Sequence, residues 1–221
     1  MPIEKSFFTF LKELTENNNI EWFHANKKRY EAQVKGPFLA LLEEIVVKAV
    51  KFEPELAATP VKSMMFRLNR DIRFSKNKDP YKDHISGLIG KYGTRDKMYP
   101  SAYLHLSLKE CFVCSGAYWF ERETLAKVRR FIMKNDKRFK KLVEDKKWVA
   151  AFGEMRGEKN KRLAPEFVAA AEKQPLLFNT QLYWCAEFNS KKALDKDFAS
   201  FVAGTMKTGL PLTEFLREAI Y

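Results

Sequence analysis

The sequence predicts an α+β fold in which a mainly antiparallel sheet packs against N-terminal and C-terminal helices. Apolar residues repeat at helical spacing near both ends, whereas the middle of the chain alternates apolar and polar residues as half-buried strands do. The strand-like stretches follow one another without helices between them, which favours antiparallel pairing. We predict a single domain over residues 1–221, with a helical part at 1–55, a sheet-containing part at 60–190 and closing helices at 195–221.

Three helices are expected in the N-terminal part. The first covers residues 3–15, where large apolar residues recur every three or four positions. Asn18 and Glu21 resemble a capping box at the start of a second helix, which we expect to end near residue 34. Gly36-Pro37 then separates it from a third helix, because glycine often ends a helix and proline suits the first turn of the next.

Strands are expected in the middle of the chain, where the period of apolar residues changes to two at Ser63. The predicted strands are residues 63–69, 85–92, 101–108, 111–119 and 181–188. The short link Lys109-Glu110 makes a hairpin of the third and fourth of these.

Helices are expected again after the hairpin. Acidic residues at its start suit a helix at 121–134, and Asp136 could cap a shorter one. Residues 148–179 are irregular apart from a possible helix bounded by two prolines. Two closing helices, at 195–203 and 212–220, are separated by a stretch containing glycine and proline.

The net charge of +12 over 221 residues is concentrated in two segments. Residues 67–97 hold nine Lys or Arg against four Asp or Glu, and residues 121–163 hold fifteen against seven. Localised positive charge points to an anionic partner or substrate, although the second segment fits a solvated basic face equally well.

Several features indicate a cytoplasmic protein with no membrane segment. No apolar run approaches the roughly 20 residues needed to span a bilayer, and the N-terminal stretch lacks the pattern of a signal peptide. Cys111, Cys114 and Cys185 are an odd number in a chain large enough to fold without disulfides, which favours a reducing compartment and reduced core cysteines. A zinc site would need four ligands and a second Cys-x-x-Cys, so no metal and no cofactor is expected.

The best candidate site is the basic loop, residues 67–84, which follows the first predicted strand and contains a stiffening proline. Closely spaced guanidinium and ammonium groups suit phosphate or carboxylate oxygens. We therefore hypothesise a small anionic, for example phosphorylated, ligand. Its candidate binding residues are Arg67, Arg70, Asp71, Arg73, Lys76, Tyr81, Lys82, His84 and His105. A histidine beside an anion site is also a candidate general acid or base, but the sequence identifies no catalytic residue and leaves enzymatic activity open.

Two alternatives stay open. In the first, Asp71, Asp79 and Asp83 neutralise the cations and pin the loop to the N-terminal helices, so that the protein is an interaction module with a purely structural loop. In the second, the basic segment 122–147 tracks the phosphates of a nucleic acid. The common phosphate-binding, dinucleotide-binding and nucleophile-elbow motifs are all missing.

Short motifs spread over nearly the whole chain carry a family resemblance. They are Asn19–Phe23, Arg70–Lys76, Pro80–Lys82, Tyr103–His105 and Gly116–Tyr118. In these motifs the chain resembles the bacterial and fungal family catalogued as domain of unknown function 2461. The resemblance implies an α+β fold without an established activity, and it singles out residues 70–82 as the part to test.

Overall fold

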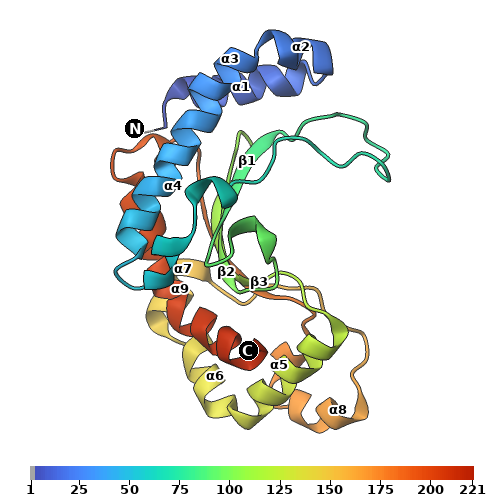
Figure 1. Cartoon of the computed structure of the whole chain (residues 1–221). Helices are drawn as coiled ribbons and strands as arrows, with labels where there is room; N and C mark the ends of the chain where they lie inside the picture. Colours follow the sequence, from blue (N-terminus) through green and yellow to red (C-terminus); the bar gives the residue numbers. More distant parts are fainter. Residues whose placement is uncertain (1–2) are drawn as a thin grey trace. The chain divides into compact units, whose positions relative to one another are not determined.

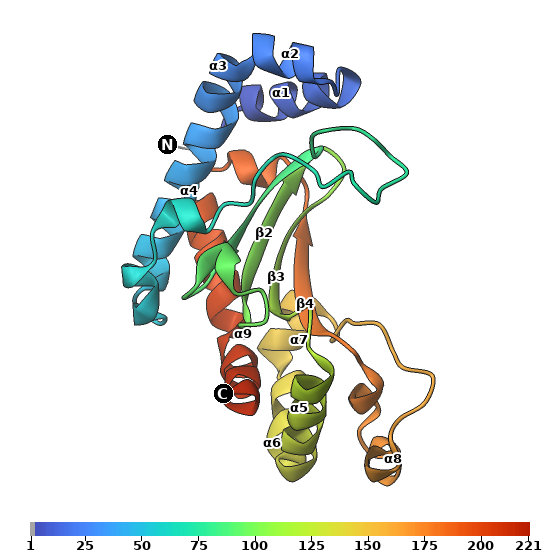
Figure 2. The same cartoon turned by 45° about the vertical axis from the view of Figure 1, so that its right-hand side comes forward.

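The computed structural model describes residues 3–221 as a four-stranded antiparallel sheet with helices before and after it, which confirms the α+β fold (Figure 1). The strands are β1 (His84–Ile89), β2 (Ser101–Ser107), β3 (Cys111–Ala117) and β4 (Leu182–Phe188), in the order β1-β2-β3-β4. Figure 2 shows β2, β3 and β4 running side by side. Short 3₁₀ turns lie at Pro54–Ala58, Val61–Ser63, Gly93–Arg95, Pro175–Phe178 and Lys192–Leu194.

The chain forms two compact units, which are described one at a time. Unit 1 comprises Met1–Thr94, Tyr103–Val113 and Glu187–Ala203, and unit 2 comprises Arg95–Ala102, Cys114–Ala186 and Gly204–Tyr221. The single domain over residues 1–221 stays a prediction.

The helices of unit 1 lie at the N-terminal end, as predicted, but their boundaries differ. They are α1 (Lys5–Glu16), α2 (Ile20–Ala25), α3 (Lys27–Tyr30) and α4 (Gly36–Ala49), with a π-helical turn at Glu31–Lys35. Gly36-Pro37 does not end a helix, because the wider π turn leads directly into α4 and accommodates the proline at its start.

The cap of α2 also differs by one residue from the prediction. Asn19, not Asn18, is the N-cap, and its side chain accepts a hydrogen bond from the backbone N–H of Trp22 at 2.8 Å. Asn18 is thereby free to bond elsewhere, and both polar atoms of its side chain bond the backbone of Tyr81.

The predicted strand 63–69 is wrong as a regular strand. Met65 forms an isolated bridge with Gly87 of β1, and Asn69 forms another with Tyr81, three residues before β1. The backbone N–H of Arg70 then donates to the carbonyl of Pro80 at 2.9 Å, after which the chain leaves the sheet as an excursion of nine residues, 71–79. The two segments therefore touch at separate points instead of forming a ladder.

The packing of α4 against β1 decides which face of the sheet is available in unit 1. Gly87 lies against α4 so closely that a Cβ there would come within 3.3 Å of Leu42. Ile85 and Ile89, two residues before and after it, are buried with it, while His84 points to the opposite face by strand alternation. That opposite face carries the site described below.

Unit 2 has a core of its own, built around Phe139, Trp148, Trp184 and Phe215. Its helices are α5 (Arg122–Lys134), α6 (Asp136–Val143), α7 (Lys146–Phe152), α8 (Pro165–Ala171) and the second part of α9 (Phe198–Ile220). Asp136 lies in the first turn of α6 without capping it, because Asn135 takes the cap position.

The two predicted closing helices are one continuous helix. Pro211 lies inside α9 and does not break it. The ring of Trp184 packs against Gly209, and a Cβ at this position would lie 2.7 Å from the indole nitrogen. Residue 209 is therefore a glycine because this contact leaves no room for a side chain. The glycine that suggested a break is therefore a packing residue.

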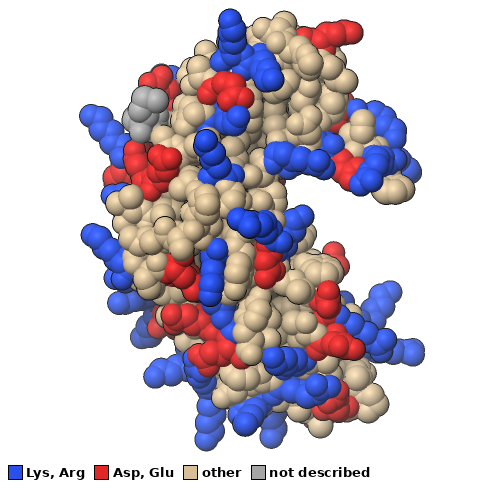
Figure 3. Space-filling view, viewed as in Figure 1, with Lys and Arg blue, Asp and Glu red and all other residues tan. Residues whose placement is uncertain are grey.

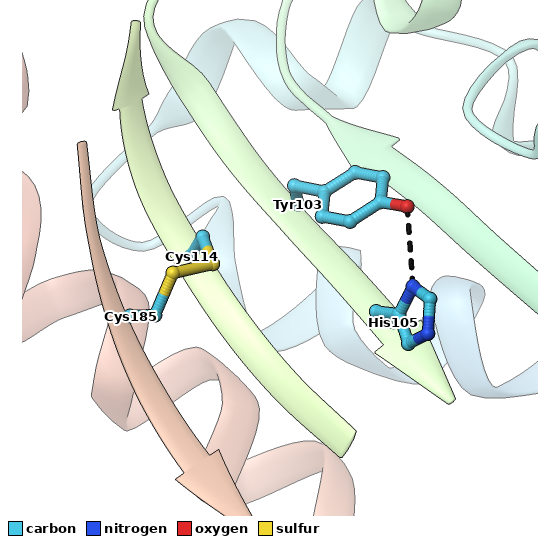
Figure 4. Close-up of a disulfide and its surroundings, with 4 residues drawn as sticks. All are labelled: Tyr103, His105, Cys114 and Cys185. Carbon is cyan, nitrogen blue, oxygen red and sulfur yellow. Dashed lines mark hydrogen bonds between the residues drawn. A yellow bond between two sulfur atoms is a disulfide. The ribbon is translucent and has the colours of Figure 1, made fainter. Parts of the chain in front are cut away.

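The expectation of three reduced core cysteines is wrong for two of them. Cys114 in β3 and Cys185 in β4 form a disulfide between neighbouring strands, with their Cα atoms 4.0 Å apart (Figure 4). The sequence alone did not indicate this pair, because 71 residues separate the two cysteines. Cys111 is buried and free. A cytoplasmic location stays a prediction, and among the described residues there is no helix with the length and apolarity needed to cross a membrane.

Candidate functional site

Two histidines stack on each other on the face of the sheet opposite α4. The rings of His84 in β1 and His105 in β2 have centroids 4.2 Å apart, and Phe112 in β3 lies parallel to His105 on its other side at 4.6 Å. The hydroxyl of Tyr103 lies 3.3 Å from Nδ1 of His105 (Figure 4). We call His84, Tyr103, His105 and Phe112 the histidine patch. Neighbouring strands bring these four residues together through ordinary cross-strand pairing.

His84 is held by a carboxylate. Its Nδ1 lies 3.1 Å from an oxygen of Asp83, and Nζ of Lys109 lies 3.9 Å from the other oxygen. Burial opposes ionisation of Asp83, but the hydrogen bond with His84 and the charges of His84 and Lys109 outweigh it and hold the pKa of Asp83 below its usual value. Asp83 therefore fixes the orientation of the His84 ring, because a carboxylate bound to one ring nitrogen determines how the imidazole is turned.

His105 is held neutral. Its side chain is 8% exposed, and burial, together with the positive charge of His84, lowers its pKa to about 4, with Asp83 opposing this shift. The tautomer with a proton on Nε2 satisfies both of its neighbours, since Nδ1 can then accept from Tyr103 while Nε2 points towards Glu110, 4.0 Å away. The patch thus pairs one carboxylate-bound imidazole with one neutral imidazole.

The neutral His105 makes stability depend on pH. In the unfolded chain it titrates near its ordinary pKa of about 6.5, so between that value and the folded value near 4 the unfolded chain binds more protons. The stability that neutral His105 contributes is therefore fully present above pH 6.5 and is lost as the pH falls towards 4. We expect the unfolding free energy of the wild type to fall between about pH 7 and about pH 5 by about 2 kcal/mol more than that of His105→Gln. Urea denaturation at both pH values measures it. An equal fall in the two proteins would contradict a neutral His105.

The base of the basic loop is fastened to the helices of unit 1 by neutral groups. Both polar atoms of the Asn18 side chain bond the backbone of Tyr81, its nitrogen to the carbonyl at 3.0 Å and its oxygen to the N–H at 3.1 Å. The ring of Tyr81 packs on Phe23 with centroids 4.2 Å apart, and burial raises the pKa of its hydroxyl. Tyr81 thus acts as an anchor of the loop.

The tip of the basic loop, residues 71–79, pairs its own charges. Arg73 donates two hydrogen bonds to the carboxylate of Asp71, at 3.0 and 2.7 Å, and these lower the pKa of Asp71. Arg70 lies 3.9 Å from Asp79, and Lys78 donates to the carbonyl of Ile72. On the loop that projects at the upper right of Figure 3, blue and red side chains accordingly lie together. The ion pairs close the tip on itself and do not fasten it to the helices.

The remaining cations of the loop differ in their surroundings. Lys82 donates to the carbonyl of Arg67 at 2.8 Å and lies over the ring of Phe66. Arg67 is exposed near Asp71, whose pKa it also lowers. Lys76 is exposed and makes no hydrogen bond or ion pair within residues 3–221. The structure thus brings Lys82, His84 and His105 to the sheet, whereas it leaves Arg73 and Lys76 on the tip.

Five of the eleven cations of the basic segment 122–147 are engaged within unit 2. Arg129 is buried and bonds backbone carbonyls, Arg130 pairs with Glu166, and Arg138 forms a two-bond pair with Glu218. Lys127 donates to the carbonyl of Ile220, and Lys140 lies 3.9 Å from Glu144. These cations hold unit 2 together, and fewer are left for a nucleic acid than the sequence suggested.

Comparison with known proteins assigns the chain to a family. A family model described as conserved hypothetical protein (DUF2461) matches residues 6–215. The chain belongs to this family. Searches of curated proteins and of solved structures found no match. Within residues 3–221 there is also no cluster of three or more His, Cys, Asp or Glu side chains that could hold a metal ion.

Three residues of the site were missed at the level of sequence. Asp83 was weighed only as a neutraliser of arginines, and Phe112 and Lys109 were assigned to the strand and to the hairpin link. The alternation of Tyr103, His105 and Ser107 did indicate one polar strand face, but only the pairing of β1 with β2 shows that His84 lies on the same face.

Proposed function

We propose that the protein binds a small anionic ligand, a phosphate ester or a carboxylate, on the histidine patch at the base of the basic loop. The observation that carries this proposal is the stacked pair of His84 and His105, with Asp83 on one ring and Tyr103 on the other. Charges held at fixed positions on a rigid sheet suit a binding site better than the same charges on a loop tip.

The surroundings of the patch favour an anion. The side chain of Lys109 is 81% exposed at its edge, and the charge of Lys82 is close enough to help lower the pKa of His105. The side chain of His84 is 23% exposed and offers its aromatic ring to an organic group, while neutral His105 stacks against it without adding another charge. The Asp83–His84 pair and a neutral imidazole are also the groups that general acid–base catalysis uses, so a ligand found here is worth trying as a substrate.

Matched variants distinguish the base of the loop from its tip. Inorganic phosphate, followed by a panel of phosphate monoesters and small carboxylates, is titrated into the full chain by calorimetry. His84→Gln and Lys109→Met, at the patch, should each weaken binding by about tenfold or more, since each removes a hydrogen-bond donor to the anion. Arg73→Met and Lys76→Met, at the tip, match the charge change of Lys109→Met and should leave the affinity within about twofold.

The opposite pattern would overturn the proposal. If the tip variants abolish binding while the patch variants retain it, the ligand belongs to the arginines of the tip. If no anion of the panel binds at low salt, the patch does not bind a small anion. Thermal unfolding of each variant confirms that the fold is intact before affinities are compared.

A further inference from the structure

A groove in the surface lies entirely within unit 2. It is a groove of about 630 Å³ between α6 and α7 on one side and the Gly204–Ile220 part of α9 on the other. Volumes of this order are typical of sites for small organic ligands. The groove shares no residue with the histidine patch, so it requires its own explanation.

One part of the groove is apolar. Leu142 of α6 is half-buried and Pro211 of α9 is exposed, and both line the groove above the buried Trp148. Pro211 and Leu212 of α9 line the opposite side. An apolar group that entered here would exclude water from this surface, which favours binding in proportion to the area covered.

The rest of the groove carries positive charge without matching negative charge. Lys141, Lys147 and Lys207 line it, all three are exposed, and none makes a side-chain hydrogen bond or ion pair with another residue of the described chain. The other two charged groups are already occupied. Arg138 is paired with Glu218, and the carboxylate of Asp145 accepts the backbone N–H groups of Lys147 and Trp148. Three lysines thus line the groove, and Asp145 is the one carboxylate among the described lining residues, so positive charge is in excess there.

From this combination we infer that the groove binds an amphipathic anion, a molecule with one carboxylate or similar acidic head and an apolar tail. The tail lies along Leu142 and Pro211, and the head meets the lysines. A fully apolar ligand would leave the lysines unused, and a polyanion such as a nucleic acid would leave the apolar surface unused. The inference is independent of the function proposed for unit 1.

Gly204 gives the inference a sharp steric test. It lines the groove on α9, and a Cβ built on it meets no atom within 4 Å. A leucine here would therefore occupy the groove without a clash at its Cβ, and helix propensity favours it over glycine in a helix interior. Gly204→Leu should block the ligand while leaving the melting temperature of the protein unchanged or higher.

The test uses decanoate as the probe, titrated into the full-length protein by calorimetry, with displacement of 8-anilinonaphthalene-1-sulfonate as a second readout. We expect saturable binding of decanoate, lost in Gly204→Leu and weakened about tenfold or more in Lys207→Glu, which is exposed and does not depend on repacking. Lys134→Glu, on α5 outside the groove, is the control for net charge and should bind as the wild type does. His84→Gln should also bind decanoate normally.

Three outcomes would overturn the inference. The first is no saturable decanoate binding by the wild type. The second is binding that survives in both Gly204→Leu and Lys207→Glu, which would place decanoate elsewhere. The third is inorganic phosphate competing as well as decanoate does, which would show that the apolar surface contributes nothing.

Discussion

Gly116→Ala should destabilise the protein by about 3 kcal/mol or more. Gly116 lies in β3 with φ of +111°, a conformation that an L-residue adopts only under strain. A Cβ there would be 2.3 Å from the carbonyl oxygen of Leu182 and 2.9 Å from the ring of Trp184, so β3 and β4 would have to separate locally. Denaturant unfolding measures the loss.

The control for this prediction is the same substitution where space is available. Gly204→Ala adds a methyl group that meets no atom within 4 Å, and alanine is preferred to glycine in a helix by roughly 0.5–1 kcal/mol. This variant should be at least as stable as the wild type. A Gly116→Ala protein with wild-type stability would mean that β3 does not hold residue 116 in the conformation described here.

Arg129→Met should cost about 3 kcal/mol of unfolding free energy. Arg129 is only 8% exposed, and it donates from Nε to the carbonyl of Leu177 at 2.8 Å and from Nη2 to that of Asn179 at 3.1 Å. Methionine keeps most of the volume but leaves both carbonyls without these donors, and each unsatisfied buried group costs roughly 1–3 kcal/mol. Burial lowers the pKa of Arg129, as expected for a cation that bonds neutral carbonyls.

The neighbouring arginine provides a matched comparison. Arg130 pairs with Glu166 on the surface, with side chains 58% and 49% exposed, and surface pairs of this kind add little stability. Arg130→Met should therefore unfold at nearly the same urea concentration as the wild type. If both variants behave alike, the hydrogen bonds of Arg129 do not stabilise unit 2 as argued.

Local signals in the sequence predicted much of the fold, because helical and strand periods report which face of each element is buried. The structure confirms the hairpin of β2 and β3 and the presence of helices at the N-terminal end, although the boundaries of these helices differ from the predicted ones. The errors fall where a distant partner decides the local structure. Gly209 suggested the end of a helix, but it is a glycine because Trp184 packs against it. Cys114 forms its disulfide with Cys185, which lies 71 residues further along the chain.

The candidate site shows the same division. The density of arginines and lysines made the basic loop conspicuous, but charge density does not reveal that Arg73 already binds Asp71. His84 and His105 were named as polar partners, whereas their stacking depends on the register of β1 against β2, which no local pattern reports.

The disulfide between Cys114 and Cys185 has a consequence for the unfolded chain. It closes a covalent ring that contains the end of β3, α5 to α8 and the start of β4, so the denatured protein cannot extend this part of its backbone unless the bond is reduced. A ring of this length removes about 4 kcal/mol of conformational entropy from the unfolded state by the chain-entropy model. Unit 2 thus has a stability that depends on the thiol reagents around it, and comparisons between its variants are meaningful only when the ring is in the same state in both.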